Sequence, residues 1–273
     1  MNASLTLVGW VDLTATVVLV GGLFFAALIA PPSDAGWRWW WRAAVALAVV
    51  LPVEFALTAF RMYEVSGLHG TPLVVDLLRT RWGRLWMGRS AGVALLAASE
   101  RLSARSRAAL GAGWLVLRSF QGHAGAHGTL PAVIDWLHLL AAAAWLGGLV
   151  QLALRPRPIP VEVAARVRAQ ATVALAVLVP AGVYAAFLHV HHLDLLVESS
   201  YGKTLIAKLA LASVLLALGA VNHFGHVPAM RRGEPRAEGR LLRAVRLEVV
   251  VGAVVLALTA LLGVLPMPHG QVR

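Results

Sequence analysis

Eight long apolar runs constrain the fold of this chain more than any other feature of its sequence. A helix needs about 20 apolar residues to cross the hydrocarbon core of a bilayer. Because lipid cannot satisfy backbone hydrogen bonds, such runs predict transmembrane helices. We therefore expect an all-α integral membrane protein, a bundle of about eight transmembrane helices, with residues 1–273 forming a single transmembrane domain. The runs cover residues 5–30, 40–60, 84–99, 107–122, 131–154, 168–190, 203–224 and 241–265.

The composition supports lipid as the solvent and excludes several classes of function. Hydrophobic residues make up 59% of the chain and charged residues only 14%, whereas soluble domains carry roughly 25% charged residues. The net charge of +11 would suggest nucleic-acid binding in a soluble protein, but the Lys and Arg residues gather in short loops between apolar runs. The absence of cysteine excludes disulfides, thiolate metal sites and Cys nucleophiles. No His-Glu-x-x-His pair is present, nor a Gly-x-Ser-x-Gly elbow between a strand and a helix, so hydrolytic catalysis is not expected.

The distribution of positive charge predicts the orientation of the chain in the membrane. Arginines are concentrated in the loops after the first, third, fifth and seventh runs, and cytoplasmic loops are those enriched in Lys and Arg. Both termini are therefore expected outside the cytoplasm, with the chain crossing the membrane many times. The third and fourth runs are short, and we expect their arginines to snorkel to the interface. These arginines are Arg84, Arg89 and Arg118.

Most of the histidines fall on one side of this predicted topology, although only Lys and Arg were used to derive it. Seven histidines lie in external loops or at external helix ends, and His138 lies about two turns into the fifth run from the same side. His223 and His226 are placed on the cytoplasmic side. The seven external residues are His69, His123, His127, His189, His191, His192 and His269.

Two stretches carry the best candidates for chemistry. His123 and His127 are four residues apart in a glycine-rich segment, and neutral imidazole suits copper, zinc, iron or nickel; a polar interfacial loop is the alternative. Asp135 and His138 are three residues apart and share a helix face. An acid and an imidazole inside a membrane are costly and usually functional, so they could ligate a metal or relay a proton, or form a structural hydrogen bond. His189 and His192 form a further possible metal pair.

Other charged residues inside the apolar runs are expected to pair with one another. Asp12 or Glu54 could neutralise Lys208 in the outer half of the bilayer, and Glu248 could pair with Arg246 or Arg243. The glycine pairs 21–22 and 147–148 predict close helix packing, because small residues let membrane helices approach each other.

Several motifs together resemble the copper-resistance D family (CopD). The resemblance is carried in order by Gly122-His123-Ala124, Asp135-Trp136-Leu137-His138, the stretch 144–149, Ser200-Tyr201-Gly202-Lys203, Lys208, Asn222, Leu247-Glu248 and Leu265-Pro266. It covers residues 119–268 as a core, with a looser match over 1–118.

This resemblance implies movement or delivery of copper across the bacterial inner (cytoplasmic) membrane, beside a separate periplasmic copper-binding partner of the CopC type. It makes the external side, where both termini are expected, the periplasm. Carried over by position, it points to His123 and His138, with Asp135 as a supporting acid. His127, His189 and His192 are added on position and chemistry alone, so that six residues form the predicted metal set for a copper ion.

Two other functions stay open on the sequence. The chain could be a haem b-binding membrane redox protein, since haem iron in a helix bundle takes two axial histidines, and His138 with His189 could supply them. It could instead be an assembly factor that holds a periplasmic metallochaperone at the membrane.

Overall fold

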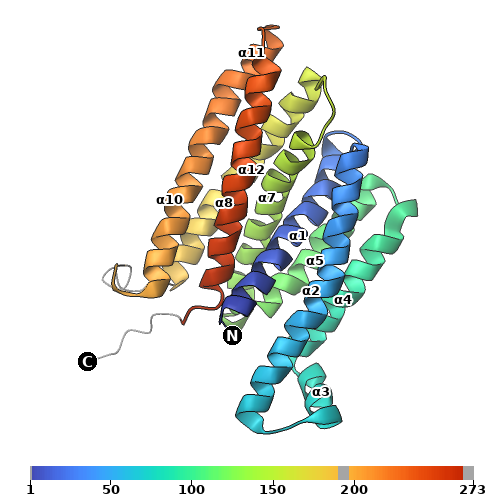
Figure 1. The fold of residues 1–273 in the computed structure, drawn as a ribbon, viewed down its shortest axis with the longest axis vertical. Coiled ribbons are helices and arrows are strands. Elements are labelled where there is room, and N and C mark those ends of the chain that lie inside the picture. The colour runs from blue at the N-terminus through green and yellow to red at the C-terminus, as the bar shows by residue number, and fades with distance from the viewer. Residues whose placement is uncertain (1, 190–196, 267–273) are drawn as a thin grey trace.

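The computed structural model describes residues 2–189 and 197–266, and within these residues the chain folds into a bundle of helices (Figure 1). Eight of the described helices have 18 residues or more, and each coincides with one of the eight apolar runs. They are α1 (Asn2–Leu28), α2 (Asp34–Ser66), α4 (Arg81–Ala98), α5 (Ala104–Gln121), α7 (Thr129–Ala153), α8 (Val161–His189), α10 (Ser200–Val221) and α12 (Ala237–Leu262).

The remaining described elements are short. They are α3 (Gly70–Arg79), the 3₁₀ turn η1 (Ser99–Arg101), α6 (His123–Ala126), the π-helical turn η2 (Asn222–His226) and α11 (Val227–Arg231).

Six of the long helices are long and apolar enough to cross a membrane, namely α1, α2, α7, α8, the continuous segment Ser200–Arg231 and α12. The chain is therefore an all-α, multi-pass membrane protein. The helices α4 and α5, which match the two short runs, are not long and apolar enough by the same measure. Of the eight predicted spans, six are therefore supported.

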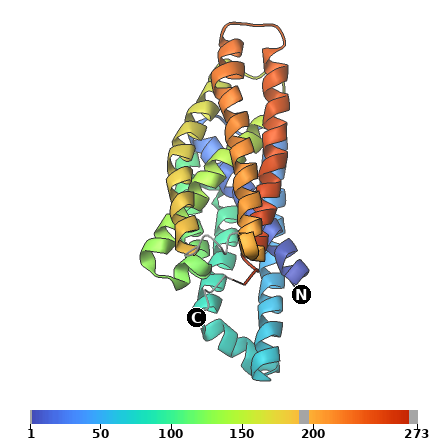
Figure 2. The same ribbon diagram turned by 90° about the vertical axis from the view of Figure 1, so that its left-hand side faces the viewer.

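The ends of the bundle differ in which elements they carry (Figures 1 and 2). One end holds the start of α1, the end of α12, α3 and α6, and α2 extends beyond its neighbours there; we call it the α3 end. The opposite end holds α11 and is called the α11 end. The described chain thus begins and finishes at the same end of the bundle.

Local sequence signals explain where several helices begin. Ser33, Thr80, Ser103 and Ser199 each precede a helix and accept a hydrogen bond from the backbone N–H three residues later, at 2.9–3.1 Å. Such caps satisfy a backbone donor that the first turn of a helix leaves unpaired. The hydroxyl groups therefore fix the starts of α2, α4, α5 and α10.

The centre of the bundle is α1, which packs against α2, α5, α7 and α12. Gly21 and Gly147 face each other where α1 meets α7, and a Cβ atom on either residue would lie 2.5 Å from the Cα atom of the other. A side chain there would force the helices apart, which costs about 1–3 kcal/mol in a well-packed core. The prediction of close helix packing at these glycines is confirmed.

Candidate functional site

Three ionisable side chains from two helices gather in the half of the bundle nearer the α3 end. Asp135 and His138 lie one turn apart on α7, and the charge of Lys208 on α10 acts on both. Helical rise places Asp135 about 9 Å and Lys208 about 12 Å from the first residues of their helices, so the three groups lie at a similar depth. We call Asp135, His138 and Lys208 the outer site.

The imidazole of His138 fills a gap in the surface of α8. Gly182 has no side chain, and a Cβ atom there would lie 3.3 Å from Cε1 of His138. The backbone of Leu178 on α8 is a hydrogen-bond partner of the imidazole, and Nδ1 of His138 is buried. The ring is therefore held between α7 and α8.

The segment with His123 and His127 lies at the α3 end, directly before α7. The single turn α6 separates positions 123 and 127 by about one helical turn, and His127 is exposed. Arg81 on α4 holds this turn in place, because its guanidinium group donates to the carbonyl oxygens of Gly125 at 2.9 Å and Phe120 at 3.4 Å. The turn therefore has a defined position above the outer site.

The predicted six-residue metal set is brought together only in part. Asp135 and His138 share one helix face, as expected. His192 lies outside the described residues, as do the side chains of His123 and His189. Among the side chains that the structure describes, no three His, Asp or Glu residues are close enough to hold a metal ion.

A buried ion-pair network lies in the same half of the bundle, and sequence reasoning assigned its members to other partners. Arg89 on α4 donates to Asp12 on α1 at 2.6 Å, to Glu54 on α2 at 3.2 Å and to Gln121 on α5 at 2.7 Å. Arg118 on α5 contacts the other carboxylate oxygen of Asp12 at 2.9 Å. Two acids are therefore balanced by two arginines.

This network overturns two predictions. Arg89 has 0% of its side chain exposed, so it does not snorkel to the interface. Asp12 and Glu54 pair with Arg89 rather than with Lys208. The signal that was available in the sequence is the charge count, because Arg89 on α4 and Arg118 on α5 are two arginines that two acids in other apolar runs could neutralise.

Glu248 also has a different partner from the one expected. Its carboxyl group accepts a short hydrogen bond from the amide of Asn222, and no ion pair of the described residues includes it, so the predicted pairing with Arg246 or Arg243 is wrong. Helix geometry explains the result, since Glu248 faces α10 and is only 1% exposed.

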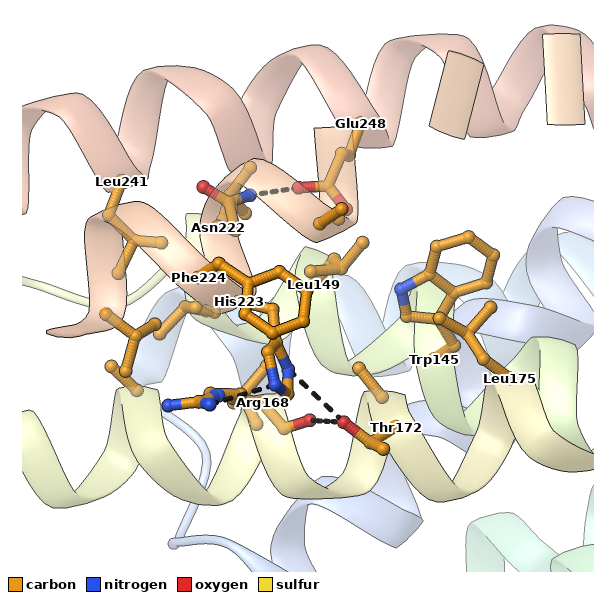
Figure 3. A pocket seen from close by; sticks show the side chains of 18 of the residues that line it. Trp145, Leu149, Arg168, Thr172, Leu175, Asn222, His223, Phe224, Leu241 and Glu248 are labelled. Carbon is orange, nitrogen blue, oxygen red and sulfur yellow. Dashed lines mark hydrogen bonds between the residues drawn. The ribbon is translucent and has the colours of Figure 1, made fainter. Parts of the chain in front are cut away.

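A cavity of about 290 Å³ borders this pair between α7, α8, η2 and α12 (Figure 3). Its walls are mostly apolar, and Trp145, Leu149, Leu175 and Leu241 are among them. The polar lining consists of Glu248, Asn222, Arg168, Thr172 and His223.

Comparison with known proteins places this arrangement of helices and polar groups in context. The family described as Copper resistance protein D matches residues 161–262. Over these residues the chain is similar to the CopD family. The matched residues cover α8, α10, η2, α11 and α12, so they include Lys208, Asn222 and Glu248, whereas Asp135 and His138 precede them.

Three relatives are similar over longer stretches. Copper transport protein CutJ of Bacillus subtilis is 28% identical over 82% of this chain and 44% of its own length. Copper resistance protein D of Pseudomonas syringae is 33% identical over 48% of this chain and 47% of its own length. Inner membrane protein YebZ of Escherichia coli is 28% identical over 69% of this chain and 70% of its own length.

The CopD-like chain thus spans less than half the length of the first two of these relatives. No solved structure matches it. The resemblance predicted from the motifs is confirmed by the family match and by the names of the relatives.

Proposed function

We propose that this CopD-like protein transports or delivers copper at the bacterial inner membrane, as one transmembrane domain of residues 1–273. The observation that carries the proposal is the outer site, where an acid, a lysine and a histidine meet inside an apolar bundle. Ionisable groups in membrane segments usually mark the path of an ion or substrate. The relatives named for copper transport and copper resistance make copper the favoured cargo.

The proposed orientation has all eight long helices crossing the bilayer and both termini in the periplasm. Described loops at the α11 end carry Arg101, Arg155, Arg157, Arg232 and Arg236, which supports a cytoplasmic location under the positive-inside rule. The α3 end, with His69, His123 and His127, then faces the periplasm, where copper is captured.

The chemistry of the outer site suggests how the cargo is taken up and passed on. Without copper, the ammonium group of Lys208 offsets the negative charge of Asp135, which reduces the cost of burying either charge. Copper captured by His123 and His127 would then displace the ammonium group from this pairing, with the carboxylate of Asp135 and the imidazole of His138 as ligands. Repulsion from Lys208 then weakens binding, so that the ion is able to leave again.

A separate periplasmic copper-binding protein of the CopC type is the proposed donor, because α2, α3 and α6 present an accessible surface at the α3 end. Haem b was the alternative cofactor. His138 is packed against α8 at Gly182 and the side chain of His189 lies outside the described part, so nothing at the site favours haem b over copper.

Copper flux into proteoliposomes tests the proposal. We expect the double variant His123→Ala with His138→Ala, and the single variant Asp135→Asn, to lose copper uptake. His69→Ala is the matched control, because His69 is exposed at the same end and lies outside the outer site. Full uptake by the first two variants would refute the proposed path.

A further inference from the structure

The cavity near the α11 end contains a carboxyl group that no cation among the described residues neutralises. Glu248 is 1% exposed, and none of the ion pairs formed by described residues includes it. Asp12 and Glu54 provide a contrast within the same bundle, since both are paired with Arg89. A buried carboxylate without a cation is costly, and binding a proton removes that cost.

The other ionisable groups in the cavity wall are engaged with each other. Arg168 on α8 donates from Nη2 to Nε2 of His223 at 2.8 Å, and Nδ1 of His223 lies 3.4 Å from the hydroxyl of Thr172 (Figure 3). Because guanidinium can only donate, Nε2 of His223 must accept and the imidazole is neutral. Trp145 on α7 and Leu241 and Val245 on α12 add no charge.

Asn222 is suited to serve both protonation states of Glu248. Its Nδ2 donates to the carboxyl group, while its Oδ1 is buried and has no partner among the described residues. An amide holds one acceptor and two donors. Rotation of the amide by half a turn would therefore let Oδ1 accept a hydrogen bond from a protonated carboxyl group, so either state keeps a partner.

The local backbone supports a functional role for this residue. Asn222 begins η2, where the N–H of Val227 bonds back to the carbonyl of Asn222 five residues earlier. Such π-helical turns are uncommon and often lie at functional sites. The wider turn orients the side chain of Asn222 toward Glu248 and the side chain of His223 toward Arg168. Gly219 keeps the adjacent space open, because a Cβ atom there would lie 3.8 Å from Oε2 of Glu248 and 4.0 Å from Trp145.

We infer that Glu248 and Asn222 form a proton-binding site whose occupancy is coupled to the movement of copper. The carboxylate of Glu248 takes one proton from water that reaches the cavity and becomes a neutral carboxyl group; releasing that proton restores the carboxylate. The coupling to copper rests on the proposed function, whereas the proton site itself does not.

Infrared difference spectroscopy of the purified, copper-free protein tests the proton site directly. The carbonyl stretch of a protonated carboxylic acid should change with pH in the wild type. Glu248→Gln, which fixes the neutral form, should remove that band, and Glu248→Asp should restore a shifted one. Glu162→Gln is the control, because Glu162 is exposed on the neighbouring helix α8. Identical spectra for the wild type and Glu248→Gln would overturn the proton site, whatever copper does.

Proteoliposomes that carry a pH-sensitive dye and a copper gradient test the coupling. Copper flux in the wild type should change the internal pH. Glu248→Gln should lower the rate of this coupled flux about tenfold or more, as expected when one interaction that stabilises the rate-limiting transition state is lost. Copper flux that is unaffected by pH and by this variant would refute the coupling. If the wild type moves no copper at all, the proposed function fails, while the infrared result still decides the proton site.

Discussion

Arg89 lies at the centre of the largest charged cluster among the described residues. Its guanidinium group contacts Asp12, Glu54 and Gln121 and lies 6.0 Å from the ring of Trp114, whose indole N–H donates back to the carbonyl of Arg89 at 2.9 Å. Replacing a whole buried ion-pair network by apolar residues and removing one of its members are different changes. Removing one member leaves an uncompensated charge in a low-dielectric interior.

We therefore predict that Arg89→Ala destabilises the bundle by about 3–5 kcal/mol, because Asp12 and Glu54 lose their common partner. Arg84→Ala, five residues earlier on the exposed face of α4, should change the free energy of unfolding by no more than about 0.5 kcal/mol. Unfolding in mixed micelles monitored by circular dichroism measures both. Equal stabilities of the two variants would show that the network contributes nothing to folding.

At the scale of single residues, the sequence located the polar groups but did not predict their partners. Spacing along one helix was sufficient for Asp135 and His138, because positions three apart share a face. The partners of Asp12, Glu54 and Glu248 come from other helices, and which helices are neighbours depends on tertiary packing. Depth in the bilayer alone does not distinguish Lys208 from Arg89 as the partner of an acid.

At the scale of elements, α4 and α5 are the least apolar of the long helices and yet pack as part of the bundle. Arg89 and Arg118 tie them to α1, and the N–H groups of Trp86 and Trp136 donate to the carbonyls of Leu51 and Ala112 at 2.8 Å. Polar contacts between helices are one of the forces that hold membrane bundles together. They compensate here for short apolar stretches.

If α4 and α5 span the membrane, the loop between them lies on the cytoplasmic side. The chain has no native cysteine, so Ser103→Cys introduces a single thiol in this loop. Because Ser103 is exposed, we predict that a membrane-impermeant maleimide labels it only after the membrane is opened. Ser66→Cys, exposed at the end of α2, should react in intact spheroplasts. Labelling of both positions from outside would leave only six spanning helices.

The sequence predicted the elements well because apolar length is a local property. All eight runs coincide with long helices, and the glycine pair Gly21 and Gly147 packs as expected. The π-helical turn at Asn222 was beyond such reasoning, because α10 is apolar on nearly all sides and has no clear periodicity that an extra residue could shift. The cavity at Glu248 follows from that turn, so it was not predicted either.

At the scale of the whole molecule, polar groups divide between two depths. The outer site and the Arg89 network lie in the half nearer the α3 end, while Glu248, Asn222 and Arg168 lie nearer the α11 end. Apolar packing of α1 against α7 and α12 runs between them. Cargo and proton are thus assigned to different parts of one bundle, and any coupling between them has to involve movement of α7, α10 or α12.

Copper binding at the outer site should stabilise the whole fold, because a ligand that binds only the folded state shifts the unfolding equilibrium by mass action. At a free copper concentration 100 times the dissociation constant, the expected gain is about 2.7 kcal/mol. Thermal unfolding of the detergent-solubilised protein, with and without copper, measures it. Asp135→Asn with His138→Ala should lose most of the gain, whereas His69→Ala should keep it, since His69 lies in the exposed turn before α3. Magnesium, which prefers oxygen ligands in octahedral geometry, should give little stabilisation to any of the three proteins. If the double variant gained as much stability from copper as the wild type, copper would be binding elsewhere and the outer site would not be its entry point.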